Sequence, residues 1–429
     1  MRIAVIGAGN VGTTLGSGWA VAGHQVAYGV RDTSRAAPHA GATMRSVADA
    51  VRESDVVVLA TSWAAVPAAL EAAGDFGGKP LLDVTNPIDT AARGAIGSGF
   101  TLTHGHDGSG AEVVASLAKN ARVVKAFNCT GLENMQNPRY GENRAVMPVA
   151  GDDAGARDLA MKLAADLGFD PVALDSLRHA RELEPLAMLW ISLAMPWGHG
   201  RDIAFRLAKR TGAEVRSTVR TSQPRALTVV GGGSIGGALA KAWLAAGHRV
   251  RLAARDGESE EARALRGLGA EVSPLRGSAE GADAVVFAIP AGAVTDAAAE
   301  MGALSGKVVV DCTNAIGKGF TLQYGHTTSS AEELAKRLPG ARIVRAFNQQ
   351  GAETLANPVF GDLRAASFVA ADDADARALV KGLATDVGLD AIEAGPLASS
   401  RYLEPMTMLW IALARAKGTR EIGLTLLRR

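Results

Sequence analysis

Two glycine-rich motifs contain the residues best suited to binding a charged ligand. Gly7, Gly9 and Gly12 spell G-x-G-x-x-G in "IAVIGAGNVGTTL", and the pattern recurs in "LTVVGGGSIGGAL". Between a strand and a helix, the first glycine allows a tight turn, the second lets the backbone approach a pyrophosphate, and the third lets the helix pack closely. Backbone N–H groups at the helix N-terminus then bind the anion. We predict dinucleotide contacts from two sets of residues: Gly7, Gly9, Asn10, Val11 and Gly12, and Gly231, Gly233, Ser234, Ile235 and Gly236.

An arginine after the second predicted strand of each copy bears on the choice of dinucleotide. Arg31 and Arg255 lie about twenty residues after their glycine motifs. A guanidinium there suits the 2′-phosphate of NADP, whereas an acidic residue would bind the 2′-hydroxyl of NAD. We therefore predict NADP, with further contacts from Ser34 and Arg35 in the first copy.

Two alternatives to these assignments stay open. Each glycine motif would also suit a tight turn without a ligand, above all in the second copy, because duplicated domains often lose function. Asp32 and Asp256 directly follow the two arginines. They would either favour NAD or serve as helix N-caps.

Asparagines follow two predicted strands in each copy. "DVTNPI" contains Asn86 and "VVKAFN" ends at Asn128, and the second copy repeats them as Asn314 and Asn348. Ligands of open α/β sheets bind beyond the carboxyl ends of the strands, and a carboxamide both donates and accepts hydrogen bonds. We expect these residues to line the nicotinamide cleft. A plain turn before Pro87 is the alternative for Asn86.

The residues after these strands differ between the copies. The identical "AFN" is followed by Cys129 and Thr130 in the first copy and by Gln349 and Gln350 in the second. We expect the difference to fall where the hydride acceptor lies, so that the two clefts serve different ligands.

The motifs recur because the chain is a tandem duplication. Segments such as "GFTLTHGH" and "GFTLQYGH", or "LEPLAMLW" and "LEPMTMLW", are repeated at a spacing of about 220 residues. A period of half the chain indicates a duplicated domain rather than a short-period repeat. We predict one domain at 1–210, a polar linker at 211–225 and a second domain at 226–429.

Strands and helices alternate within each copy. In the first, we expect strands in "RIAVI", "QVAYGV", "DVVVLAT" and "PLLDVT", with a helix after the glycine motif that stops at Gly23. Continuous apolar runs indicate parallel strands buried on both faces. The predicted class is α/β, with two Rossmann-type, doubly wound parallel sheets. The last third of each copy should be a helical extension.

The overall composition of the chain bears on its binding partners and on the cellular compartment in which it works. The chain has 429 residues, 48% of them hydrophobic, and a net charge of +1, so no global field favours nucleic acid or a membrane. "PLAMLWISLAMPW" is too short to span a bilayer, which needs about 20 residues. The presence of only two cysteines indicates a reduced, cytoplasmic setting. No group of cysteines or histidines has the spacing of metal ligands, so we predict no metal site.

The combination of motifs resembles a known family. The glycine motif, the arginine after the second strand, the S-x-A-E helix start, "KAFN" and the "LEP" helix resemble the NADP oxidoreductases dependent on coenzyme F-420, a deazaflavin. The cytoplasmic domains of the six-transmembrane epithelial antigen metalloreductases are similar. The resemblance covers almost all of each copy, and it implies hydride transfer between NADPH and FMN, FAD or coenzyme F-420. It also implies cofactor contacts from the loop that begins at the end of "DVVVLAT" and from its counterpart in the second copy: Thr61, Ser62, Trp63, Ile289 and Pro290.

Few side chains are candidates for acid–base chemistry. Hydride transfer to a flavin-type ring needs little from the protein beyond orientation. Asn86, Asn128 and His106 are the candidates, and His106 is matched by His326 in the second copy. A reductase of a small carbonyl or imine, with His106 or Tyr140 as proton donor, and a non-enzymatic dinucleotide-binding or scaffold protein remain alternatives.

Two helices are expected to bring the copies together. The apolar segments at 183–194 and 403–414 are nearly identical. Relatives in the resembled family typically dimerise through such helices. We expect an intramolecular pseudo-dimer, and association of whole chains stays open.

Overall fold

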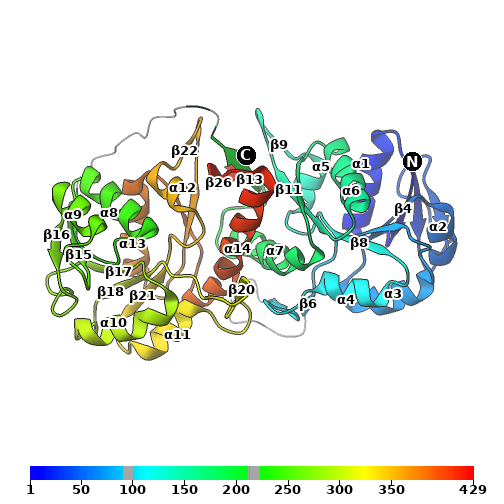
Figure 1. Ribbon diagram of the computed structural model, residues 1–429. Helices are drawn as coiled ribbons and strands as arrows, with labels where there is room; N and C mark the ends of the chain where they lie inside the picture. Colours follow the sequence, from blue (N-terminus) through cyan, green and yellow to red (C-terminus); the bar gives the residue numbers. More distant parts are fainter. Residues whose placement is uncertain (90–99, 211, 213–222) are drawn as a thin grey trace. The chain divides into compact units, whose positions relative to one another are not determined.

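The computed structural model describes residues 1–89, 100–210, 212 and 223–429 (Figure 1). The chain divides into two compact units. The first consists mainly of residues up to Arg206, and the second extends from Leu207 to Leu426. Most of the predicted linker at 211–225 lies outside the described residues.

The first unit contains an eight-stranded sheet in the order β3-β2-β1-β4-β5-β8-β11-β12. The strands from β3 to β8 are parallel and follow the 3-2-1-4-5-6 order of dinucleotide-binding sheets. β11 is antiparallel to β8. This order places a topological switch point, where ligands bind, between β1 and β4. The bounds are β1 Arg2–Ile6, β2 Gln25–Gly29, β3 Thr43–Arg45, β4 Val56–Leu59, β5 Pro80–Asp83, β8 Arg122–Lys125, β11 Val146–Gly151 and β12 Asp170–Leu174.

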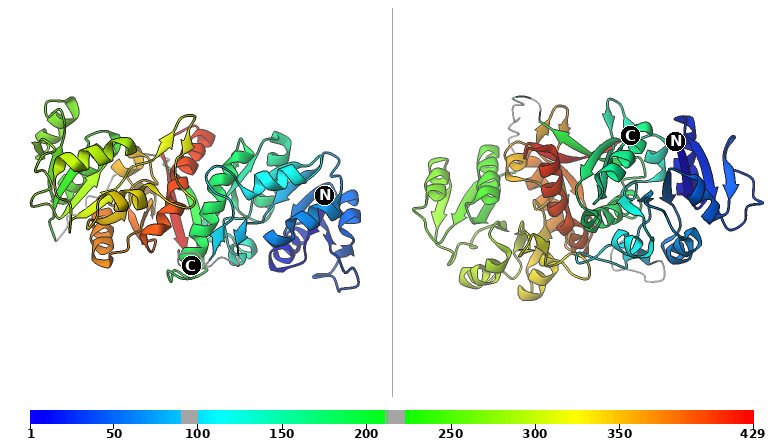
Figure 2. Two further views of the ribbon diagram at one scale, coloured as in Figure 1. Left: turned by 90° about the horizontal axis from the view of Figure 1, so that it is seen from below. Right: turned by 45° about the vertical axis from the view of Figure 1, so that its right-hand side comes forward.

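Helices cover both faces of this sheet (Figure 2). α2, α3 and α4 share one core with the strands. On the other side, Trp19 of α1 donates a hydrogen bond to the carbonyl of Leu163 in α6 (3.0 Å) and packs edge-on against Phe127. The helices are α1 Asn10–Val21, α2 Val47–Glu53, α3 Val66–Ala73, α4 Gly110–Leu117, α5 Leu132–Gln136, α6 Ala154–Asp166 and α7 Ala180–Ala194, with the 3-10 turns η1 Trp63–Ala65 and η2 Leu177–His179.

The second unit repeats the parallel order as β16-β15-β14-β17-β18-β21. Successive residues of β17 and β18 point into two separate cores, one with α8, α9, α12 and α13 and the other with α10 and α11. This alternation is expected of a sheet covered on both faces. The strands are β14 Ala226–Val230, β15 Arg249–Ala253, β16 Glu271–Ser273, β17 Ala284–Phe287, β18 Val308–Asp311 and β21 Arg342–Arg345. The helices are α8 Ser234–Ala246, α9 Glu260–Gly267, α10 Val294–Met301, α11 Ser330–Arg337, α12 Ala352–Ala356, α13 Ala374–Val387 and α14 Ser400–Lys417.

The last third of each copy is not simply helical, contrary to the sequence-based expectation. β11 and β12 extend the first sheet, and β24 (Ala366–Val369) pairs with β25 (Asp390–Glu393) in the second unit. Two further strands, β13 Ile203–Lys209 and β26 Ile422–Arg428, follow α7 and α14. Among the helices that the structure describes, none is long and apolar enough to cross a membrane.

Each unit contains a few residues from the end of the other copy. Leu427–Arg429 belong to the first unit, where the Arg429 guanidinium lies 4.4 Å from the Tyr140 ring centre and donates to the carbonyl of Asn137 (3.0 Å). Arg210 belongs to the second unit, where its guanidinium lies 5.1 Å from the Phe360 ring centre. The copies are therefore not separated cleanly at the boundary between them.

Candidate functional site

A cavity of about 430 Å³ lies in the first unit, beyond the carboxyl ends of β1, β2 and β4. It brings together residues that the sequence predicted from three separate segments: Gly7, Gly9, Arg31, Arg35, Thr61 and Ser62. Four alanines complete one wall, at η1 and along α3: Ala65, Ala68, Ala69 and Ala72. Sequence reasoning missed this wall, although its spacing of three and four residues marks one helix face.

The three glycines of the first motif have different structural reasons to be glycine. Gly7 has φ +106°, and a Cβ there would lie 2.6 Å from the carbonyl oxygen of Ala60. A Cβ on Gly12 would lie 2.1 Å from the carbonyl oxygen of Gly7. Gly9 has nothing within 4 Å of such an atom, so its surroundings are open for a ligand to approach.

The second motif has the same geometry. Gly231 has φ +98°, a Cβ on Gly236 would lie 2.0 Å from the Gly231 carbonyl oxygen, and the space beside Gly233 is open. Ile289 lies directly beside Gly231, and Pro290 precedes η3 (Ala291–Ala293). Both loops are thus built for close approach of a ligand.

The arginines after the second strands are exposed and available. Neither Arg31 nor Arg35 donates a hydrogen bond to any residue that the structure describes, and both line the cavity. The buried Thr61 hydroxyl also lacks a partner within the described chain. Exposed guanidiniums, a buried hydroxyl without a partner and an open backbone loop around one cavity fit an anionic dinucleotide.

The aspartates beside these arginines are not helix N-caps, which corrects one of the alternatives. Asp32 Oδ1 accepts from the Ser34 hydroxyl (2.6 Å) and from its backbone N–H (3.1 Å). These bonds lower the pKa of Asp32. Asp256 similarly accepts from the backbone of Glu258, while Ser259 caps α9. Asp32 thus orders the turn after Arg31, as Asx turns do, and also engages the Ser34 hydroxyl.

The cleft asparagines connect the sheet to α7 and α14. Asn128 is 4% exposed, and its Nδ2 donates to Asn86 Oδ1 (3.0 Å) and to the Leu183 carbonyl (2.9 Å). Asn348 donates likewise to Leu403, and Thr407 donates to Asn314 Oδ1 (2.7 Å). None of the four lines the cavity described above, so their contact with a cofactor stays a prediction. Asn128 Oδ1 is buried without a partner in the described residues.

Three of the four variable residues after "AFN" are buried, contrary to the expectation that they line a cleft, whereas Thr130 is partly exposed. Cys129, Gln349 and Gln350 are all at most 5% exposed. Gln350 Nε2 donates to the backbone carbonyls of Ala366 and Leu424. The glutamines therefore satisfy backbone groups in the interior, which is the ordinary requirement for buried polar atoms.

The aromatic loop differs between the units. Trp63 packs edge-on against His104, with 5.6 Å between ring centroids, and His104 Nδ1 lies 2.8 Å from the Thr103 hydroxyl. The Nδ1 atom of His106 is buried and has no partner among the described residues. The second copy has Ala291 in place of Trp63.

A buried ionic cluster behind each cleft was missed by sequence reasoning. Lys125 Nζ lies 2.9 Å from both Asp83 Oδ2 and Glu184 Oε1, and all three side chains are at most 2% exposed. Arg345 pairs with Asp311 (2.7 Å) and Glu404 (2.8 Å) in the second unit. Burial raises the pKa of Glu184 and of Glu404. The only signal in the sequence is that the same charged positions recur inside apolar runs.

Comparison with known proteins gives concordant matches. A family model described as "NADP oxidoreductase coenzyme F420-dependent" matches residues 2–87 and 226–315. The F420-dependent NADP reductase of Methanothermobacter marburgensis is 30% identical over 213 residues, which cover 45% of this chain and 92% of that protein. Metalloreductase STEAP3 of Rattus norvegicus is 30% identical over 193 residues, 44% of this chain and 37% of that protein, so the match spans little more than a third of its length.

A solved structure also matches one copy. The putative F420-dependent NADP reductase from Arthrobacter sp. FB24 is 33% identical, with a TM-score of 0.43 over 47% of this chain and 96% of that one.

Proposed function

Because this chain belongs to the family of coenzyme F420-dependent NADP oxidoreductases, we propose that its first unit transfers hydride between NADP(H) and a flavin or deazaflavin. The chain is an NADP-dependent oxidoreductase. Our proposal concerns the hydride acceptor, which is FMN, FAD or coenzyme F420. The observation that carries the proposal is the cavity lined by both the open Gly9 loop and the exposed Arg31 and Arg35.

The first unit distributes the binding of NADP(H) among different groups. Arg31 and Arg35 hold the 2′-phosphate, because a guanidinium matches phosphate geometry. Backbone N–H groups at the start of α1 hold the pyrophosphate. The alanine wall of α3 leaves room for the flat adenine ring. When bound, the nicotinamide supplies or accepts the hydride.

The acceptor side needs an aromatic surface more than an acid or a base. Trp63, held by His104, offers a ring for a flat acceptor to stack on. In the reductive direction, NADPH and one proton convert the oxidised acceptor to its reduced form and leave NADP⁺. Solvent supplies that proton, or His106 does.

A pair of glycine variants assigns the cofactor site. Gly9→Ala fills only open space, so it should leave the melting temperature unchanged while its methyl group obstructs the pyrophosphate. We expect the Kd for NADPH to rise at least about tenfold, a loss of about 1.4 kcal/mol. Gly233→Ala is the matched change in the second unit. Calorimetric titration of both variants with NADPH measures the change in affinity. If Gly9→Ala binds NADPH as tightly as the parent protein does, the assignment is wrong.

The acceptor is tested by NADPH oxidation with coenzyme F420, FMN, FAD and a small carbonyl compound. We expect turnover with at least one of the first three and loss of that turnover in Gly9→Ala. Turnover with the carbonyl alone would support an acid–base reductase, and binding without any turnover would support a non-enzymatic protein.

We further propose that α7 and α14 pair to make an intramolecular pseudo-dimer, and that the protein works in the cytoplasm. The near-identical apolar sequences of these helices support the pairing, and two buried, unpaired cysteines support a reducing compartment. A compact chain of this length has a radius of gyration of about 22 Å. We expect small-angle scattering to give that value, and a markedly larger one would contradict the pairing.

A further inference from the structure

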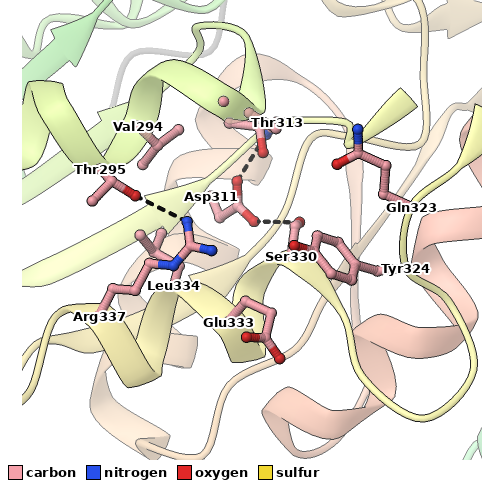
Figure 3. A pocket seen from close by; sticks show the side chains of 12 residues that line it. Val294, Thr295, Asp311, Thr313, Gln323, Tyr324, Ser330, Glu333, Leu334 and Arg337 are labelled. Carbon is pink, nitrogen blue, oxygen red and sulfur yellow. Dashed lines mark hydrogen bonds between the residues drawn. The ribbon is translucent and has the colours of Figure 1, made fainter. Parts of the chain in front are cut away.

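The second unit contains a pocket of about 190 Å³ between α10 and α11, with several polar side chains in its lining (Figure 3). It opens beside the carboxyl end of β18, the edge of the sheet at which ligands bind in such folds. Thr295 comes from α10, and Glu333 and Arg337 come from α11. Tyr324 lies across the pocket from Arg337 in Figure 3. The pocket thus has charged and hydroxyl-bearing groups from three segments of the chain.

At four of the matching positions the first copy has an apolar or bulky residue. Trp63 corresponds to Ala291, and its indole packs against His104. The other exchanges make the second copy more polar: Pro67 to Thr295, Val113 to Glu333, and Leu117 to Arg337. Removal of the indole opens this region in the second unit, and the new side chains make it polar. The lining of this pocket therefore differs between the two copies.

The Ser330 hydroxyl on the floor of the pocket already has hydrogen-bond partners. The Ser330 hydroxyl lies 2.9 Å from Asp311 Oδ2 and 2.7 Å from Glu404 Oε1, and Figure 3 shows it pointing toward Asp311. The first copy has Gly110 here, where a Cβ would lie 3.0 Å from Pro87. The second copy has Ala315 in place of that proline, which makes room for the serine.

The walls offer one positive and one negative group. Arg337 donates to the Thr295 hydroxyl (3.0 Å) and retains further N–H donors. Glu333 lies four residues earlier on the same helix face. Its Oε1 accepts from Thr328 and forms an ion pair with the exposed Lys336 (2.6 Å), and its Oε2 has no contact in these bonds. A guanidinium suits a carboxylate, and a carboxylate suits an ammonium group.

We propose that this pocket binds a small amino acid zwitterion, with its carboxylate at Arg337 and its ammonium at Glu333. A cavity of about 150 Å³ holds benzene, so this one has room for about six to eight non-hydrogen atoms. The neighbouring carboxylates disfavour a dianion such as phosphate. The site is independent of hydride transfer in the first unit.

The test uses 4-aminobutyrate with butyrate, butylamine and inorganic phosphate as matched probes, titrated into the full chain by calorimetry. We expect 4-aminobutyrate to bind at least tenfold more tightly than butyrate or butylamine, because each lacks one charge. Equal binding of butyrate or phosphate would reduce the site to a simple anion site and overturn the proposal, as would no heat with 4-aminobutyrate.

Two variants place residues of the first copy at the matching positions of the second. Because those residues occur in the same local fold in the first unit, the variants should fold. Ala291→Trp should refill the pocket, and Arg337→Leu should remove the guanidinium; each should weaken 4-aminobutyrate binding at least tenfold. Leu117→Arg in the first unit is the control and should leave the parent affinity unchanged. Unaltered melting temperatures verify folding, and undiminished binding in both variants would overturn the assignment.

Discussion

Replacing Arg31 and Arg35 together by alanine should raise the Kd for NADPH by about a hundredfold or more and leave the Kd for NADH almost unchanged. A hydrogen bond to a charged group contributes about 1.5–3 kcal/mol, and both guanidiniums line the cavity without a hydrogen bond to any described residue. Since NADH lacks the 2′-phosphate, it loses nothing. Fluorescence or calorimetric titration with both nucleotides measures the ratio.

The second unit supplies the control for this experiment. Arg255→Ala removes the matching arginine there, and we expect it to leave NADPH binding in the first unit intact. Because none of these arginines supports the fold through a hydrogen bond within the described residues, melting temperatures should stay within about a degree of the parent. An equal loss of NADPH and NADH affinity in the double variant would show that the arginines do not contact the 2′-phosphate.

Replacing Lys125 by methionine should lower the free energy of unfolding by about 3–5 kcal/mol. The change leaves Asp83 and Glu184 buried without their cation, and a buried unpaired charge is strongly unfavourable. Urea denaturation at pH 8 measures the loss. Lys119→Met is the matched control, since Lys119 is 73% exposed and pairs with Asp75 on the surface; it should cost less than about 1 kcal/mol.

The loss should be smaller at pH 5 than at pH 8. Burial raises the pKa of Glu184, so that carboxyl group gains a proton at a higher pH than an exposed glutamate does. Once protonated, it no longer requires Lys125. A loss that is the same at both pH values, or that matches the Lys119→Met control, would show that the cluster contributes little to stability.

Local features of the fold were predictable because their causes are local. The first strand, the glycine turn and α1 follow from a short apolar run, from Gly7 at a positive φ and from helical spacing. β11 was not predictable in the same way. It contains Pro148 and pairs antiparallel with β8, which lies more than twenty residues earlier, so its partner is invisible to a local pattern. Proline inside a strand also argues against a strand on sequence grounds.

The residues of the candidate site also differ in how well their sequence alone predicts their position. Arg31 and the glycines depend on their own segment, and the structure gathers them around one cavity. Asn128 depends on Asn86 and on the backbone of Leu183, far along the chain, and no spacing rule predicts such a contact. The backbone before it is also unusual. Phe127 and Phe347 have φ of +62°, a conformation that bulky residues rarely adopt.

The exchange of chain ends between the units limits how this protein can be taken apart. Arg429 contacts Tyr140 in the first unit, and Arg210 contacts Phe360 in the second. A protease that cut between the copies would therefore release no complete domain, because each fragment would carry the terminal residues of the other unit.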